Sequence, residues 1–249
     1  MDLPLDVKTL AAGYGKTPVI DQIELAVQPG EIFGLVGLNG AGKTTFIRSI
    51  LSIGPSTGEI RMFGKLAGPP AARENTVYLP ERFQPSPLLK GWEFLTLTVA
   101  YYKQSLDREA ARAMCAGLDL DVRVLDRSVR GYSKGMGQKL GLIGTLLTGL
   151  PFLILDEPMS GLDPRARILL KDRLLDYKKK GNSIFFSSHI LSDIEEICDR
   201  IAVMHRGRLI FTGTPAELME TNEAPTLERS FLVAIDRADR ERTDFPPGR

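Results

Sequence analysis

The stretch GLNGAGKTT, from Gly37 to Thr45, constrains this chain more than any other part of its sequence. It directly follows an apolar run at residues 32–36 and precedes a segment with helical spacing. A strand that turns tightly into a helix points successive backbone N–H groups, and the positive end of the helix, at one place. Glycines at positions 37, 40 and 42 permit the dihedral angles that this turn needs. The stretch therefore predicts an α/β fold with a loop that binds the phosphates of a nucleoside triphosphate.

The side chains at the end of this loop extend the interpretation. Lys43 is expected to reach the β and γ phosphates, Thr44 to place its hydroxyl on Mg²⁺, and Thr45 to donate to the α phosphate. Charge, metal and backbone dipoles then converge on one polyphosphate. The predicted nucleotide-binding residues of the loop are Gly37, Leu38, Asn39, Gly40, Ala41, Gly42, Lys43, Thr44 and Thr45.

Length and composition limit the other possibilities. The 249 residues suffice for one large α/β domain, or for a domain with a subdomain, and do not favour two full-sized domains. The formal net charge is +1, with Lys and Arg spread through the chain, so no general attraction to nucleic acid is expected. Cys115 and Cys198 lack a metal-binding spacing, which indicates reduced thiols in a cytosolic protein. Without a signal core or a long apolar stretch, the chain is expected to be soluble.

Hydrophobic spacing divides the chain into regions. Strands are predicted at residues 19–27, 31–36 and 59–63, and residues 85–149 have helical periodicity. A parallel α/β core then resumes, with strands at 152–155 and 183–187, a helix at 165–180 and a hairpin around residues 206–207. We expect one domain over residues 1–221, with a helical insertion at about 85–149. Residues 222–249 are expected to be a short C-terminal extension whose final dozen residues are disordered.

Two carboxylates follow the apolar run at residues 152–155. Open α/β sheets bind ligands at the C-terminal ends of their strands, which is where Asp156 and Glu157 are expected to lie. Asp156 is suited to holding Mg²⁺ through water, and Glu157 to orienting and polarising the water that attacks the γ phosphate. The alternative is a solvated strand end without a catalytic role.

Together with other motifs in the same order, these residues resemble the nucleotide-binding subunit of ATP-binding-cassette (ABC) transporters, over nearly all of residues 1–220. The matching stretches are GYGK with Tyr14, the Walker A loop at 37–45, YLPE at 78–81, YSKGM at 132–136, LILDEP at 153–158, SGLDP at 160–164 and the strand end with Ser187, Ser188 and His189. The resemblance implies an α/β P-loop NTPase cassette with a RecA-like core, an N-terminal antiparallel β subdomain and a helical insertion.

The resemblance also implies roles for single residues. Tyr14 would stack on adenine, although a lone tyrosine commonly serves packing. Ser133 would donate to a γ phosphate while capping the helix that begins there, and Gly135 would allow close approach. His189 would contact the γ phosphate and sense hydrolysis, whereas His205, in the expected hairpin, is interpreted as structural.

In this family the signature segment, here YSKGM, acts on the nucleotide of a partner subunit. The resemblance therefore implies a dimer, expected to be a homodimer, that closes on ATP and drives an integral membrane permease from the cytoplasmic face. ATP and Mg²⁺ are the implied cofactors, and nucleic acid is not an implied partner. YLPE, GYSKGM and the stretch LERSF at 227–231 are similar to those of ABC-2-type exporters.

The chain departs from the family pattern at the signature and at the glutamine loop. Glu81 stands where the family has glutamine, which adds a negative charge near the metal and makes Glu81 a candidate metal ligand. Lys134 and Met136 replace a glycine and the glutamine of the usual signature. The alternatives are a soluble ABC ATPase without transport, such as an iron–sulfur assembly subunit, and a regulatory partner that does not hydrolyse ATP. Glu157 argues against the latter.

Overall fold

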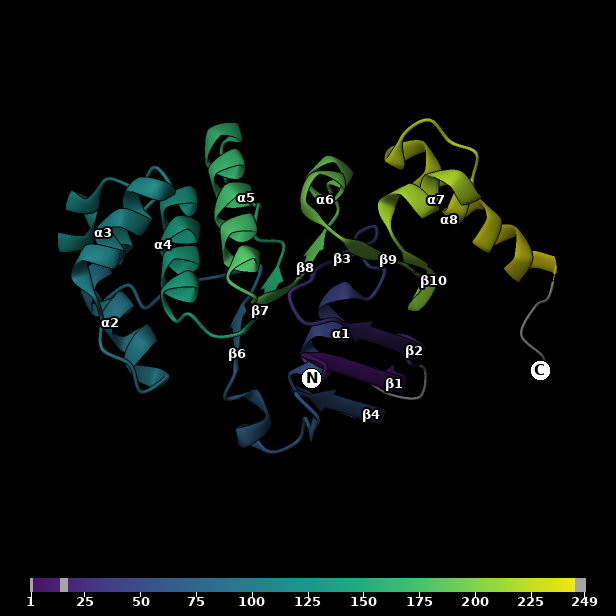
Figure 1. Ribbon diagram of the computed structural model, residues 1–249, viewed down its shortest axis with the longest axis horizontal. Coiled ribbons are helices and arrows are strands. Elements are labelled where there is room, and N and C mark those ends of the chain that lie inside the picture. Colours follow the sequence, from purple (N-terminus) through teal and green to yellow (C-terminus); the bar gives the residue numbers. More distant parts are fainter. Residues whose placement is uncertain (1, 14–17, 245–249) are drawn as a thin grey trace. The chain divides into compact units, whose positions relative to one another are not determined.

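The computed structural model describes residues 2–13 and 18–244, and the chain divides in it into two units. Residues 1–72 and 187–249 belong to the first unit, and residues 73–186 to the second. Figure 1 shows the elements of both units, coloured along the sequence. Tyr14, which we expected to stack on adenine, lies outside the described residues.

An antiparallel sheet begins the first unit. Its strands are β1 (Leu5–Ala12), β2 (Ile20–Val27), β4 (Ser56–Met62) and β5 (Lys65–Leu66), in the order β2-β1-β4-β5. The sequence did not reveal β1. Its pairing with β2 shifts between Val7 and Leu10, and Thr9 between them has a φ of 47°, so the alternation of buried and exposed residues is broken there.

The first unit also holds the strand that leads to the glycine-rich loop. This strand, β3 (Ile32–Val36), is buried at every residue and pairs in parallel with β9 (Arg200–His205). Strand β10 (Arg208–Gly213) pairs with β9 as an antiparallel hairpin, which confirms the turn predicted at residues 206–207. The helices of this unit are α1 (Lys43–Ile50), α6 (Leu191–Ile197), α7 (Pro215–Thr221) and α8 (Leu227–Asp244).

A reciprocal pair of hydrogen bonds fixes the start of β3. The backbone N–H of Ile32 donates to the Asp199 carboxylate over 2.8 Å, and the N–H of Asp199 donates to the Ile32 carbonyl over 2.9 Å. Next to this pair, the Arg200 guanidinium lies 3.2 Å from the Glu31 carboxylate. Burial raises the pKa of Glu31 above its ordinary value, and the Gln28 N–H and Arg200 partly offset that rise. Ile32 and Asp199, 167 positions apart in the sequence, thus fix the first residue of β3 in place.

The second unit combines parallel strands with the helical region. Strand β6 (Thr76–Leu79) pairs in parallel with β7 (Phe152–Asp156), whose other neighbour is β8 (Ser183–Ser188). The helices are α2 (Gly91–Tyr101), α3 (Arg108–Gly117), α4 (Lys134–Leu147) and α5 (Pro164–Lys179), with short 3₁₀ helices at Val122–Asp126 and Val129–Gly131. Helix α4 packs closely because it carries glycine at its contacts: a Cβ at Gly141 would lie 2.7 Å from the Phe83 ring.

The C-terminal segment differs from the expectation of disorder over the final dozen residues. Helix α8 continues to Asp244, so residues 238–244 are helical. Leu227, Phe231 and Ile235 recur every four residues and are buried, which anchors α8 although its remaining residues are mostly charged. Among the helices of the described ranges, none is long and apolar enough to cross a membrane.

Candidate functional site

The glycine-rich loop joins β3 to α1, as the sequence predicted. Gly40 has a φ of +83° and Gly42, the N-cap of α1, a φ of +112°, which only glycine adopts readily. Leu38, Asn39 and Gly40 are exposed, whereas Gly37 and Gly42 are buried. The tip of the loop therefore presents its backbone to solvent at the positive end of a helix, while both ends of the loop are fixed. This geometry suits an anion.

Lys43 adds a positive charge to the loop. Its ammonium donates to the Gly37 carbonyl over 2.6 Å and lies 3.5 Å from the Leu38 carbonyl, and the residue is only 7% exposed. The side chain therefore folds back over the loop instead of extending into solvent. Thr44 is exposed and Thr45 half-buried at the first turn of α1. Backbone N–H groups, one ammonium and two hydroxyls form the donor set that a polyphosphate needs.

The turn between β9 and β10 packs against the glycine-rich loop and supports it. The N–H of Gly207 donates to the Ala41 carbonyl over 2.8 Å, and a Cβ at Gly37 would lie 2.5 Å from the Met204 carbonyl oxygen. A Cβ at Gly42 would meet the Ile20 side chain at 2.7 Å. Sequence reasoning did not identify Gly207 as part of this site, because only the tertiary structure brings it to the loop.

Replacing Gly207 with alanine is expected to destabilise the fold strongly. Its φ is +80°, and a Cβ there would overlap the carbonyl oxygen of Val19, a backbone atom that has little freedom to move. We expect the free energy of unfolding to fall by about 3 kcal/mol, since overpacking and backbone strain add. Gly30→Ala is the matched control, because Gly30 has a φ of +71° and nothing within 4 Å of a Cβ. It should lose only about 1 kcal/mol. Urea unfolding measures both, and equal losses would contradict the support described for Gly207.

His189 also belongs to the first unit. It follows β8, is exposed, and precedes α6. The backbone leaves the strand in a fixed turn, because the N–H of Ile190 donates to the Ser188 hydroxyl over 3.0 Å and both Ser187 and Ser188 are buried. An exposed imidazole on a rigid strand end is accessible to a ligand.

The second unit carries the two adjacent carboxylates. Asp156 ends β7 and is 1% exposed, and Glu157 is 8% exposed. Glu157 has a φ of +48°, which is unusual for a residue other than glycine, and its carbonyl accepts a hydrogen bond from the Ser160 N–H over 3.0 Å. The predicted strand at residues 152–155 is thus confirmed, and its carboxylates follow the buried segment directly.

The segment YSKGM forms the start of α4. Ser133 is its N-cap and accepts a hydrogen bond from the Met136 N–H over 3.2 Å, which confirms the predicted cap. A Cβ at Gly135 would lie 3.0 Å from the Gly161 carbonyl oxygen. The buried Gln138 amide donates to the Pro158 carbonyl over 3.0 Å, so it ties α4 to the residues that follow Glu157. Sequence reasoning missed Gln138, whose burial is not evident from its polarity.

Two other residues of these motifs are held by local contacts. Tyr132 donates its phenolic hydroxyl to the Val124 carbonyl over 2.7 Å, and burial raises its pKa to about 12, so the phenol stays neutral. Asp163 caps α5 by accepting from the Ala166 N–H over 2.9 Å, which lowers the pKa of its carboxyl. Both contacts fix the backbone beside residues 133 and 160.

Glu81 does not share a pocket with Asp156, the other candidate metal ligand of its unit. It is exposed and lines a pocket of about 670 Å³ together with Ser133, Lys134, Gln138 and Ser160, whereas Asp156 does not line this pocket. The structure thus places Glu81 beside the YSKGM segment. Over the described ranges, no group of His, Cys, Asp and Glu side chains forms a cluster of three or more that could hold a metal ion.

Sequence comparisons place these features among known proteins. Residues 20–160 match the sequence model of the family described as ABC transporter. An uncharacterized ABC transporter ATP-binding protein of Synechocystis is 39% identical over 84% of this chain, which spans about 60% of that protein's length. The transporter ATP-binding protein EcsA of Bacillus subtilis is 36% identical over 87% of this chain and 89% of EcsA. Nod factor export ATP-binding protein I of Burkholderia orbicola is 34% identical over 88% of this chain and 73% of that protein.

Solved structures agree with the sequence comparisons. The ATP binding subunit of an ABC transporter has a TM-score of 0.85 and 32% identity, over 92% of this chain and 98% of that one. A dimeric ATP-binding cassette bound to ADP and Pi has a TM-score of 0.77 over 84% of this chain and 98% of that one, and its 18% identity makes it evidence for the fold alone. These similarities confirm the predicted α/β cassette with its antiparallel β subdomain.

Proposed function

The chain belongs to the ABC transporter family of ATP-binding proteins, and from this premise we propose that it is the ATP-hydrolysing subunit that powers a separate membrane permease. The observation that carries the proposal is the loop between β3 and α1, in which an exposed tip that ends at the left-handed Gly40 is followed closely by the buried Lys43. A nucleoside triphosphate satisfies that donor set. The subunit is expected to work at the cytoplasmic face of the membrane, held there by the permease.

Each loop residue has a proposed task in binding. The backbone N–H groups at the tip donate hydrogen bonds to the β phosphate, and the Thr45 hydroxyl donates to the α phosphate. The Lys43 ammonium gives up its hydrogen bond to the Gly37 carbonyl and binds the β and γ phosphates instead. Tyr14 remains the candidate for stacking on adenine. Because the Lys43 ammonium already has a carbonyl partner, binding replaces one hydrogen bond with stronger charge-assisted ones.

The metal that accompanies ATP fits the residues present. Mg²⁺ prefers a few protein oxygen ligands together with phosphate oxygens and water, and Thr44 and Asp156 offer a hydroxyl and a carboxylate. When bound with the nucleotide, the ion would neutralise phosphate charge during hydrolysis. Glu81 is a weaker candidate ligand than Asp156, because its carboxylate is exposed to water on the pocket beside Ser133, which Asp156 does not line.

Glu157 and His189 are the proposed catalytic residues. Glu157 orients and polarises the attacking water by accepting its proton at a carboxylate oxygen, and its nearly complete burial limits competition from bulk solvent. His189 contacts the γ phosphate and responds to its loss, a role for which its exposed ring on a fixed strand end is suited.

Ser133 and Gly135 are proposed to act on the nucleotide of a second subunit. Both lie at the positive start of α4, Ser133 is exposed, and the absence of a side chain at Gly135 permits close approach. We propose a homodimer that closes on ATP and opens after hydrolysis, because closure depends on contacts to the γ phosphate.

Ser133→Ala is expected to prevent this closure. The variant should lose ATP-induced dimerisation and about tenfold or more of ATPase activity, since a hydrogen bond to a charged group contributes about 1.5–3 kcal/mol. Ser128→Ala is the control, because Ser128 caps a neighbouring 3₁₀ helix by accepting from the Arg130 N–H. Each loses about 1 kcal/mol of stability as a cap. Size-exclusion chromatography with ATP separates a loss of dimerisation from a loss of stability. If Ser133→Ala dimerises as well as Ser128→Ala does, Ser133 does not act on the nucleotide of a second subunit.

Export is the proposed direction of transport. The motifs YLPE, GYSKGM and LERSF support it, as does similarity to a Nod factor export ATP-binding protein. The test is to trap a tagged Glu157→Gln variant with ATP in its native cells, solubilise the membranes gently and identify the proteins that co-purify. A polytopic membrane protein related to exporters is expected. A soluble partner with nothing from the membrane would instead favour an assembly ATPase.

A further inference from the structure

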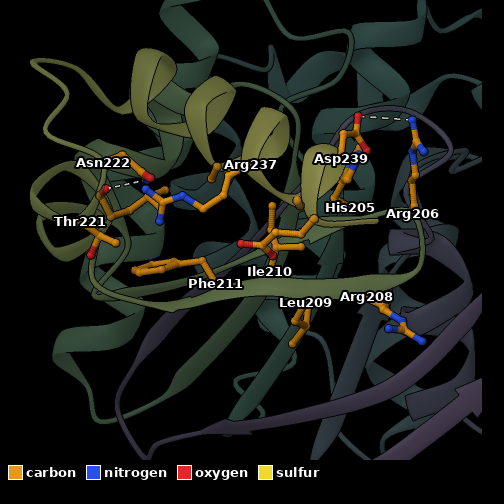
Figure 2. Close-up of a pocket in the computed structure, with 14 residues that line it drawn as sticks. His205, Arg206, Arg208, Leu209, Ile210, Phe211, Thr221, Asn222, Arg237 and Asp239 are labelled. Carbon is orange, nitrogen blue, oxygen red and sulfur yellow. Dashed lines mark hydrogen bonds and ion pairs between the residues drawn. The ribbon is translucent and has the colours of Figure 1, made fainter. Parts of the chain in front are cut away.

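A pocket that none of the proposed roles uses lies in the first unit, between β10 and the helices α7 and α8. Its volume is about 760 Å³, within the range of sites that hold small organic molecules. Figure 2 shows Ile210 and Phe211 of β10 on one wall, with Arg237 of α8 opposite them. The cluster of His205, Arg206 and Asp239 lies at the other end of the pocket.

The sequence of β10 explains the apolar wall. Pairing with β9 shifts between Leu209 and Phe211, so the consecutive side chains of Ile210 and Phe211 both lie on the α8 side of the strand (Figure 2). The Phe211 ring lies over Gly213, where a Cβ would come within 2.7 Å of the ring. A bulge and a glycine thus hold a half-buried aromatic ring against the pocket.

The sequence of α8 explains why the space is open. The helix faces the pocket with Ala234 and Ala238, one turn apart, where larger apolar residues would fill the volume. Phe231 and Ile235, by contrast, are buried at 5% and 7% exposure. The pocket therefore stays open because one face of α8 carries small residues, while its larger apolar residues anchor the helix elsewhere.

Most charged side chains around the pocket form ion pairs, but Arg237 forms none with the described residues. The Asp239 carboxylate lies 2.8 Å from His205 Nε2 and 3.3 Å from the Arg206 guanidinium, and Arg208 lies 3.1 Å from Asp21. Arg237 makes no hydrogen bond or ion pair with any residue in the described part of the chain, Glu241 one turn further along α8 included. Its guanidinium is the cation left to receive an external acceptor.

We propose that this pocket binds a small amphipathic organic anion, with its acidic group on Arg237 and its apolar, preferably aromatic, body against Ile210 and Phe211. The two ends of such a ligand match the two kinds of surface that the pocket offers. The opposite end of the pocket contributes to the support of the phosphate loop, because His205 and Arg206 directly precede Gly207. We therefore leave His205 and Asp239 unchanged in the test.

The test uses the full chain and 8-anilinonaphthalene-1-sulfonate, a fluorescent sulfonate with an aromatic body. We expect saturable binding that weakens about tenfold in Arg237→Gln, because a charge-assisted hydrogen bond is lost. Ala234→Leu should also weaken this binding, because its larger side chain occupies part of the pocket, while its melting temperature stays equal or rises. Arg240→Gln is the matched control, an exposed arginine of α8 that does not line the pocket, and its affinity should equal that of the unchanged protein.

N-phenyl-1-naphthylamine, which has the same aromatic body without the sulfonate, isolates the contribution of charge. Its binding should be weaker and insensitive to Arg237→Gln, yet reduced further in Ala234→Leu. Sulfonate binding that is unchanged in both Arg237→Gln and Ala234→Leu would overturn the site, and equal affinity for the two dyes would overturn its preference for anions. No nucleotide enters these titrations, so their result does not depend on the proposed ATPase function.

Discussion

Replacing Lys43 with alanine is expected to weaken ATP binding by at least about a hundredfold and to abolish hydrolysis. The ammonium is held over the loop by the Gly37 carbonyl at 2.6 Å, so it is positioned before the nucleotide arrives and loses little side-chain freedom on binding. Each charge-assisted hydrogen bond to phosphate contributes about 1.5–3 kcal/mol, and one ammonium makes more than one of them. Alanine removes all of them and leaves the Gly37 carbonyl without this donor.

Isothermal titration with ATP measures the loss directly. Lys43→Arg should recover little affinity, because a planar guanidinium does not reproduce the compact ammonium at this buried position. Lys180→Ala removes the same charge from an exposed helix end and should bind ATP as the unchanged protein does. An affinity for ATP in Lys43→Ala within about fivefold of that control would refute the assignment of this loop.

Replacing Glu157 with glutamine is expected to lower kcat by about 10²- to 10⁴-fold, the usual contribution of a positioned general base. Glutamine has the same shape and meets the same backbone conformation at a φ of +48°, so the change removes the proton acceptor with little disturbance of the fold. ATP affinity should change by less than about threefold, since the interaction is made in the transition state. The variant should therefore accumulate as an ATP-bound dimer.

Single-turnover hydrolysis and equilibrium ATP binding, measured on one preparation, separate these effects. Glu195→Gln is the control, because Glu195 is an exposed carboxylate on α6 and its replacement should leave kcat unchanged. A Glu157→Gln variant that hydrolyses ATP at the rate of this control would refute the catalytic assignment.

The sequence predicted elements whose pattern is local. A buried strand before the glycine-rich loop, a second one before Asp156, and a hairpin turn near Gly207 each rest on a few adjacent residues, and all are present. The cap of α4 by Ser133 was predictable for the same reason, because an N-cap acts within its own first turn.

Elements with an interrupted or sparse pattern were missed. Strand β6 has only the residues Thr76–Leu79 before a proline, and β1 is broken by its bulge. Residues 238–244, the last part of α8, were expected to be disordered because the C-terminal stretch is highly charged and the sequence ends in Pro-Pro-Gly-Arg. In each case burial against other elements decides the structure, and burial is a property of the folded chain.

The site itself divides in the same way. The motifs indicate which residues bind and react, but the contacts that hold them come from distant segments. The hydrogen bonds from Gly207 to Ala41 and from Gln138 to Pro158 both depend on tertiary packing, and no spacing in the sequence predicts either of them. The pocket beside α8 likewise arises from a bulge in one strand and two alanines in a helix that follows it.

The pairing of Ile32 with Asp199 has a consequence for synthesis. The strand that carries the phosphate loop emerges from the ribosome 167 residues ahead of its partner. At about 5–20 residues per second, this interval lasts roughly 10–30 s. During that time the apolar β3 has no β9 to pair with, so the nascent chain exposes a strand that is buried at every residue in the folded protein. The period of greatest risk from aggregation, and of greatest need for chaperones, therefore falls before residue 200 has been translated.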